Sequence, residues 1–220
     1  MKKNTRKLKK AALLLCSAVL LVCISIGATV AYLTSQDTVT NTFTVGNVTI
    51  ELDEAKVDAD GKALTGEAAQ RVKANSYKLL PGHTYDKDPT VTVKSGSEEC
   101  YVKMTVTFTK AAELDEIFKP TGADMTSIFK GYNSSNWLDK GNTENTTANT
   151  RTYEFWYKET VAAPTADVAL DALFDQIAVP GTINNTQLAT IAGMTITVNA
   201  YAIQADGFAN AEAAWAAYPA

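Results

Sequence analysis

The sequence predicts an all-β protein, an antiparallel jelly-roll-like β-sandwich with a few short helices, preceded by an N-terminal signal helix. Runs of β-branched residues alternate apolar and polar side chains with a period of two, as half-buried strands do. Gly, Pro and Asn turn signals separate six to eight such runs. The spacing of the runs is irregular, which excludes a repeat array and favours a sandwich.

Residues 1–31 have the features of a secretory signal peptide. Six basic and no acidic residues precede an uncharged run over residues 11–31, and Thr29 and Ala31 place small side chains at positions −3 and −1 of a cut between Ala31 and Tyr32. The run also has the length of a membrane anchor, since a bilayer core needs about 20 apolar residues. Cleavage is favoured because no basic cluster follows the run. We therefore predict a single domain over residues 32–220.

The charge that remains after cleavage limits the partners of this domain. The whole chain carries 20 basic and 24 acidic residues, so removal of the six basic leader residues leaves 14 against 24. An acidic exterior argues against nucleic acid and anionic membranes as partners. We expect membrane contact only through the uncleaved signal.

Cysteine use narrows the chemistry further. Cys16 and Cys23 lie in the leader, which leaves Cys100 as the single cysteine of the predicted domain. An internal disulfide and a cysteine-based metal cluster are thereby excluded. We expect Cys100 to be buried as a small hydrophobic residue, with an intermolecular bridge as the alternative.

The first predicted element after the leader is a β-hairpin. Val39, Phe43 and Val45 share one face of an alternating run, and threonines occupy the other face. A Gly46-Asn47 turn follows, and a second alternating run covers residues 48–52. Residues 53–74 are acidic and then Ala-rich, which favours a solvated loop or short helix.

The clearest strand covers residues 101–109, because four apolar side chains alternate there with Lys and Thr. A shorter strand over 89–93 follows the Pro81-Gly82 turn. Helical turns are expected over 111–118 and 126–129, followed by a long surface loop over 131–151 that contains Trp137. An aromatic strand over 151–159, with Trp156 on the outer face, comes next. The rest of the chain predicts a helix or strand over 170–177, a helical turn over 188–191, a strand over 194–204, and a helix over 209–217 that docks Trp215.

Catalytic motifs are missing from the sequence. The single histidine, His83, stands beside the Pro81-Gly82 turn, and there is no HExxH, no G-x-S-x-G and no phosphate-binding glycine loop. Acid pairs such as Asp53-Glu54 are typical of solvated turns. We predict no catalytic residue, no metal site and no cofactor, and hence no enzyme.

Three segments carry a resemblance to a known family. The junction over residues 27–52, with Ala31, the Phe43-Thr-Val-Gly46 block and the strand that ends at Glu51, resembles the TasA/camelysin (CalY) family. These proteins are exported from Gram-positive bacteria, and the signal peptidase SipW cleaves their signal peptides. The block from Leu80-Pro-Gly82 to Val102 resembles the family's turn and core strands, and residues 200–215 are similar to the endings of SipW-dependent clostridial proteins.

The resemblance implies a secreted jelly-roll subunit of extracellular or biofilm-matrix fibres. Its partners would be a SipW-type signal peptidase, further copies of itself, and other matrix components or the cell wall. In such fibres the N-terminal segment of one subunit completes the sheet of the next. Here residues 38–45 would be the donor strand, with Val39, Phe43 and Val45 filling the partner's groove. The alternative is that this segment forms a hairpin within its own subunit.

Two other functions stay open at this point. Camelysin-like members are described as metallo-endopeptidases, and such an activity would need an acidic metal site from Asp53, Glu54, Asp58 and Asp60, an unusual ligand set for zinc. A monomeric cell-surface module that binds glycans through Trp137 or Trp156 is the second.

Overall fold

The structure is a computed structural model that describes residues 46–118 and 128–219. The chain divides into two compact units, Met1–Thr44 and Val45–Ala220, and every described residue belongs to the second unit. The predicted signal helix, the cut between Ala31 and Tyr32, and the donor residues Val39, Phe43 and Val45 lie outside the described residues.

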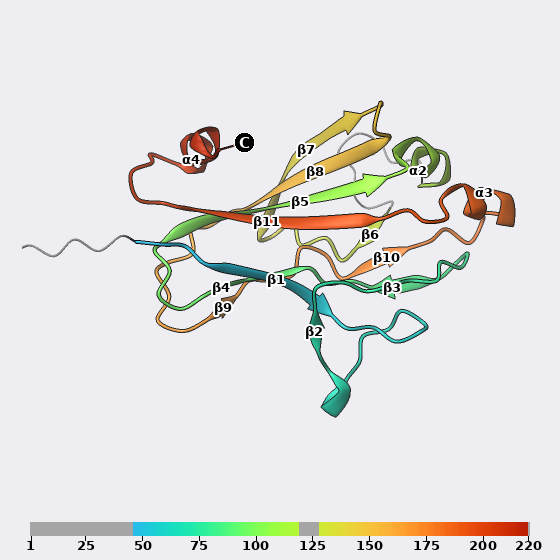
Figure 1. Cartoon of the computed structure of the whole chain (residues 1–220), viewed down its shortest axis with the longest axis horizontal. Coiled ribbons are helices and arrows are strands. Elements are labelled where there is room, and N and C mark those ends of the chain that lie inside the picture. The colour runs from blue at the N-terminus through green and yellow to red at the C-terminus, as the bar shows by residue number, and fades with distance from the viewer. Residues whose placement is uncertain (1–45, 119–127, 220) are drawn as a thin grey trace, which may run out of the picture. The chain divides into compact units, whose positions relative to one another are not determined.

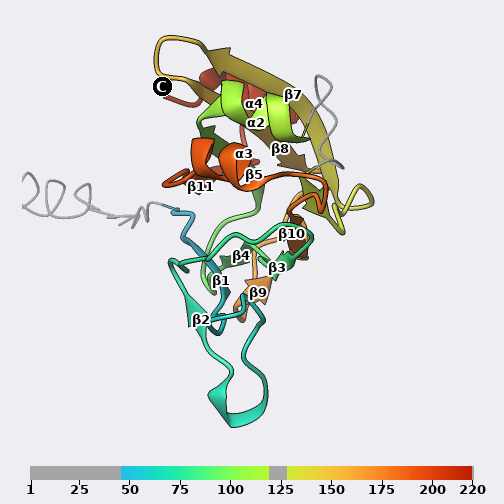
Figure 2. The ribbon, with the colours of Figure 1, turned by 90° about the vertical axis from the view of Figure 1, so that its right-hand side faces the viewer.

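The described part of the chain forms antiparallel β-sheets arranged in layers (Figures 1 and 2), which confirms the predicted fold class. One four-stranded sheet has the order β2-β1-β4-β9, built from β1 (Ile50–Ala55), β2 (Arg71–Val72), β4 (Thr90–Val93) and β9 (Val168–Ala169). The other has the order β11-β5-β8-β7, built from β5 (Cys100–Thr109), β7 (Trp137–Asn145), β8 (Thr150–Tyr157) and β11 (Ile196–Gln204). A small sheet joins β3 (Thr84–Asp86), β10 (Gln176–Ala178) and β6 (Phe129–Lys130).

Strand β5 organises the core because its alternating pattern buries every second side chain. Cys100, Val102, Met104, Val106 and Phe108 are at most 1% exposed, and the residues between them are half-buried. Each such apolar side chain contributes about 1.5–3 kcal/mol on burial. Burial also raises the pKa of the Cys100 thiol to about 11, with a smaller contribution from Glu99. The predicted burial of this cysteine is confirmed.

Short helices close the ends of the layers. Their bounds are α2 (Ala111–Phe118), α3 (Asn185–Thr190) and α4 (Ala211–Ala217), with a 3-10 turn at Gly66–Ala68. In α3 the Asn184 side chain accepts from the Gln187 amide, and the Gln187 side chain accepts from the Asn184 amide. As predicted, α4 buries Trp215. Within residues 46–118 and 128–219, no helix is long and apolar enough to span a membrane.

The predicted surface loop over residues 131–151 is wrong. Residues 137–145 form β7, and Trp137 is fully buried. The sequence conceals this strand because a register shift between Asp139 and Asn142 interrupts its alternation, and Gly141 there has a φ of +92°. The Asn- and Thr-rich composition of the segment reflects a strand that is polar on its outer face.

Two smaller expectations also need correction. Phe129 was expected in a helical turn but lies in β6, where it pairs with Ile177 of β10. The number of strands exceeds the predicted six to eight, since eleven are present in the described ranges. Three of the eleven, β2, β6 and β9, have only two residues each, which is too short for a periodic pattern.

Candidate functional site

A row of core-facing side chains on β11 is only half-buried. Ile196 and Val198 stand opposite Phe108 and Val106 of β5, so the four side chains share one face of the sheet. The β5 residues are at most 1% exposed, whereas both β11 residues have intermediate exposure. The difference arises because β11 is an edge strand, and no described strand pairs with its other side.

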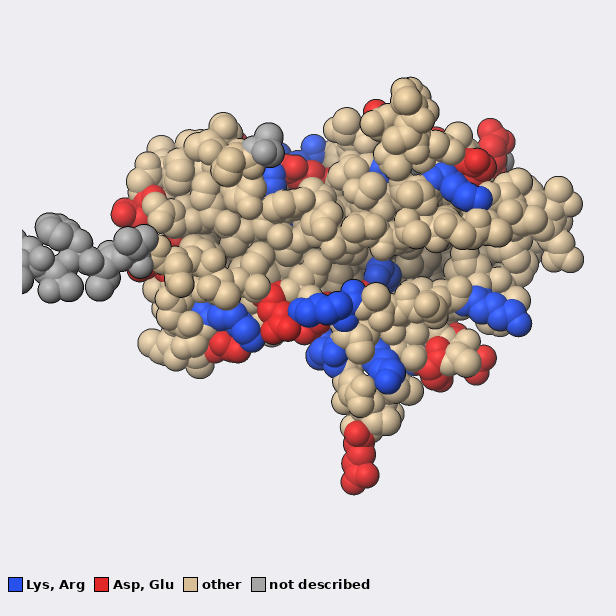
Figure 3. Space-filling view, viewed as in Figure 1, with Lys and Arg blue, Asp and Glu red and all other residues tan. Residues whose placement is uncertain are grey.

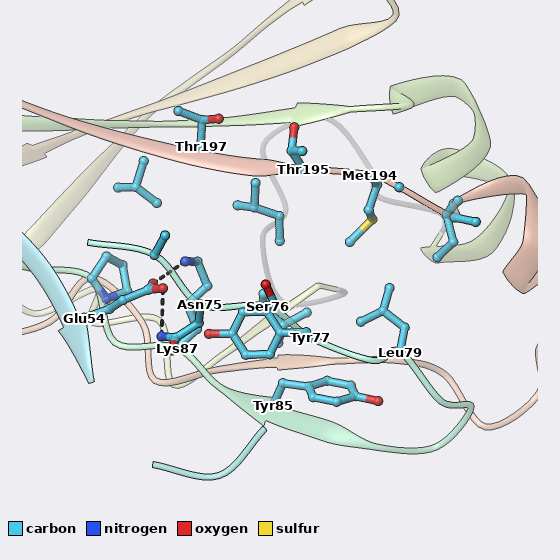
Figure 4. A pocket seen from close by; sticks show the side chains of 18 of the residues that line it. Glu54, Asn75, Ser76, Tyr77, Leu79, Tyr85, Lys87, Met194, Thr195 and Thr197 are labelled. Atoms are coloured by element: carbon cyan, nitrogen blue, oxygen red, sulfur yellow. Dashed lines mark hydrogen bonds and ion pairs between the residues drawn. The ribbon is translucent and has the colours of Figure 1, made fainter. Parts of the chain in front are cut away.

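A groove with a volume of about 1100 Å³ lies beside this edge. Figure 4 shows its two walls, with β11 on one side and the extended segment from Asn75 to Leu79 on the other. Tyr85 and Ile177 line it from the small sheet, and Leu188 and Ile191 line it from the region of α3. The volume is large enough to hold several side chains of an added peptide segment.

The β11 wall of the groove offers main-chain hydrogen-bonding groups. The Thr109 amide donates to the Thr195 carbonyl at 3.1 Å, so the main chain of Thr195 faces β5. Main-chain direction alternates along an antiparallel strand. The N–H and C=O groups of Ile196 and Val198 therefore face the groove.

The opposite wall offers such groups as well. Asn75, Tyr77 and Leu79 are half-buried, while the residues between them are exposed, so the segment is extended like a strand. The Tyr77 hydroxyl donates to the Asp86 carbonyl at 3.0 Å, which anchors the segment over β3. For the main-chain N–H groups of residues 76–79, no acceptor lies among the described residues.

One end of the groove is polar. Glu54 and Lys87 are 6% and 7% exposed and form a buried ion pair. Asn75 Nδ2 donates to Glu54 Oε1 at 2.9 Å and to the Ala55 carbonyl at 2.8 Å, while Asn75 Oδ1 accepts from the Val57 amide at 3.1 Å. We call Glu54, Asn75 and Lys87 the polar cluster. All three residues line the groove.

The other end of the groove is apolar. Leu79 and Met194 lie there in Figure 4, and Leu188 and Ile191 add further apolar side chains to the lining of the groove. Tyr77 lies between the two ends, and burial raises the pKa of its hydroxyl, with a smaller contribution from the charge of Glu54, so this group stays protonated at neutral pH. The groove therefore changes from charged to apolar along its length.

The two edges of the sheet that contains β11 differ in their protection against further pairing. Strand β7 carries the register shift described above and the charged residues Asp139, Lys140 and Glu144, which discourage another strand from adding. Strand β11, with the sequence ITVNAYAIQ, has no charged residue. Figure 3 shows an uncharged strip along β11, with Lys, Arg, Asp and Glu gathered below it over β1 and β2.

The acids named for a metal site do not converge. Asp53 pairs with Arg71 at 2.8 Å, Glu54 belongs to the polar cluster, and Asp58 accepts from the amides of Asp60 and Lys62, each at 2.9 Å. Across the described ranges, no group of three or more His, Cys, Asp or Glu side chains is placed to hold a metal ion.

His83 is exposed in the predicted turn, with its Nδ1 3.1 Å from the Pro81 carbonyl oxygen.

The rings of the two tryptophans named for glycan binding both pack against other residues of the chain. Trp137 is fully buried and donates from Nε1 to the Asp171 carbonyl at 3.0 Å. Trp156 is half-buried, with Lys140 Nζ 4.1 Å above its ring and the Trp215 ring 6.2 Å away.

Sequence reasoning missed the groove. It assigned Glu54 to a solvated turn and gave no role to Asn75, Tyr77 or Lys87. The one available signal was the strand over residues 194–204, which alternates like a core strand yet carries no charge to protect an edge.

The fold and the groove together define an antiparallel β-sandwich with one unprotected sheet edge along an open cavity. Comparison of the chain with protein-family models, with curated proteins and with solved structures finds no match.

Proposed function

We propose that this protein is a secreted structural subunit of extracellular or biofilm-matrix fibres, and that residues 38–45 of one copy insert into the groove of the next. The half-exposed row at Ile196 and Val198, on an uncharged edge beside an open groove, carries this proposal. A sheet edge with free main-chain groups binds an added strand. Head-to-tail insertion of this kind builds an open filament.

The donor segment suits the groove in length and chemistry. Its sequence, TVTNTFTV, carries no charge, like the edge that it would join. Eight extended residues span about 26 Å, and the five groove-lining residues from Met194 to Val198 span about 17 Å. The segment is therefore long enough to cover the part of the edge that lines the groove. Val39, Phe43 and Val45 would fill the groove and cover its half-exposed apolar side chains.

The predicted leader explains how the donor segment becomes available. Cleavage between Ala31 and Tyr32 by a SipW-type signal peptidase would free the segment from the membrane outside the cell. Other matrix components or the cell wall would be further partners of the fibre. The alternative functions have less support, because Asp53 and Glu54 pair with Arg71 and Lys87, the four acids named for a metal site do not converge, and Trp137 is buried.

Electron microscopy of the Phe43→Asp variant tests the proposal. A carboxylate at position 43 would enter the apolar groove, so we expect fibres to disappear while the circular dichroism of the domain is unchanged. Thr44→Asp is the matched control, since residue 44 lies on the opposite face of the segment and its variant should still form fibres. Fibres of normal abundance from Phe43→Asp would contradict the proposal.

A further inference from the structure

The two ends of the groove differ in chemistry, and each wall runs in a defined chain direction between them. In Figure 4, Thr197 lies on the side of Glu54, and Met194 lies on the side of Leu79. Strand β11 therefore runs from the apolar end of the groove to the polar cluster. The segment from Asn75 to Leu79 runs the opposite way. An inserted strand is antiparallel to one wall and parallel to the other, so the two possible orientations are chemically distinct.

Lys87 has hydrogen-bonding capacity that the described residues leave unused. Its ammonium group has three N–H donors, and its single acceptor among the described residues is Glu54 Oε2. The side chain is nonetheless buried. Unpaired donors on a buried charge are costly. An oxygen acceptor supplied by the occupant of the groove would satisfy one of them.

The donor segment contains one residue that meets this need. Asn41 shares the parity of Val39, Phe43 and Val45, so in an extended donor strand it would lie on the face that enters the groove. It is the only polar residue on that face, and its side-chain carbonyl is an acceptor. A single polar residue in an apolar interface fixes the register of the two partners, because only one alignment satisfies it.

We infer that the donor strand lies antiparallel to β11 with Asn41 at the polar cluster, opposite Val198. This inference rests on the proposed function and specifies the partner's alignment in the same groove. An antiparallel register then places Phe43 opposite Ile196 and Val45 opposite Met194. Phe43, the largest donor side chain, and Val45 thereby both lie on the apolar side of the polar cluster, with Val45 at the apolar end. In the reverse orientation Phe43 would lie away from the apolar end, and Val39 would be the apolar donor side chain nearest to that end.

Paired cysteines test the register. Directly opposite residues have Cα atoms about 5.5 Å apart, which a disulfide bridges. The Phe43→Cys, Ile196→Cys variant should therefore link neighbouring subunits, whereas Val39→Cys, Ile196→Cys should not. Each variant of residues 32–220 is copolymerised with an equal amount of unmodified subunit, so that fibre growth does not depend on the altered strand. Cys100 is buried and does not compete.

The readout is a covalent dimer on a non-reducing gel of oxidised fibres. A dimer at least tenfold stronger for the 43/196 pair than for the 39/196 pair supports the register. A stronger dimer from 39/196, equal dimers from both, or none from 43/196 in well-formed fibres would overturn it and leave strand donation intact. Failure of the unmodified subunit to form fibres would instead overturn the proposed function.

Discussion

The Lys87 ammonium and the Glu54 carboxylate face each other at the groove with almost no access to water, although 33 positions separate the two residues in the chain. Asn75 supports the carboxylate from the other side through a 2.9 Å hydrogen bond. The pair joins β1 to the segment after β3, so it fixes the polar end of the groove. A buried charge whose ionic partner is removed is strongly destabilising, which makes the site sensitive to single substitutions.

Lys87→Met should destabilise the domain strongly. Removing one member of a buried ion pair leaves the other charge uncompensated and costs about 3–5 kcal/mol of unfolding free energy. Lys73→Met is the matched control, because the Lys73–Glu51 pair is exposed and water screens it, so its loss should change the free energy of unfolding far less. Urea unfolding of both variants measures the difference. Equal effects of the two substitutions would show that the buried pair has no special role.

Val198→Lys should prevent fibre formation without unfolding the subunit. A lysine at position 198 places a charge on the groove face of β11, where the apolar donor side chains would pack, and Val198 is half-exposed, so its charge can reach water in the monomer. Thr197→Lys places the same charge on the exposed outer face of β11 and should leave fibres intact. Light scattering during assembly distinguishes the variants. Normal assembly by Val198→Lys would exclude this edge as the acceptor.

Asn41→Leu should weaken assembly if the polar cluster receives Asn41. Loss of the acceptor leaves a donor of Lys87 unpaired at a cost of about 1–3 kcal/mol, which corresponds to a rise of about fivefold to 150-fold in the critical concentration. Thr40→Leu, on the opposite face of the segment, is the control and should change little. Sedimentation of fibres from a concentration series gives both values. An unchanged critical concentration for Asn41→Leu would argue against the contact.

The Asp86 carboxylate should make stability depend on acid pH. Burial opposes its ionisation, but the Ala63 amide, Gln176 and Lys62 outweigh burial and hold the pKa of Asp86 below its ordinary value. The ionised group therefore stabilises the fold above about pH 4, and this contribution is lost as the pH falls through the lowered pKa.

Thermal denaturation between about pH 2.5 and 6 tests this dependence. Wild type should exceed Asp86→Asn in stability at pH 6, and the gap should close in acid. Asp60→Asn alters an exposed carboxylate and should follow wild type throughout. A gap that is constant with pH would mean that the Asp86 charge does not contribute.

The sequence predicted the strands whose faces differ clearly in polarity. Strand β5 alternates without interruption over ten residues, and β8 carries Tyr153 and Phe155 on its core face. Strand β7 escaped prediction because its register shift breaks the alternation. Two-residue strands such as β6 are defined by their partners rather than by their own sequence.

The groove lay beyond prediction for a different reason. Burial of Glu54 depends on Lys87 and Asn75, and only the folded chain brings these residues together. Sequence patterns identify which face of a strand is apolar, but they do not show whether another strand covers it. Val198 follows the same alternation as the core residue Val106, and only the structure shows that its groove is open.

The most direct test of strand donation compares residues 32–220 with a version that begins at Asn47, by electron microscopy and size-exclusion chromatography. The shorter version retains all the strands that the structure describes. We expect fibres from the longer protein and folded monomers from the shorter one. Fibres from both would contradict polymerisation through residues 38–45, and monomers from both would contradict a fibre subunit altogether.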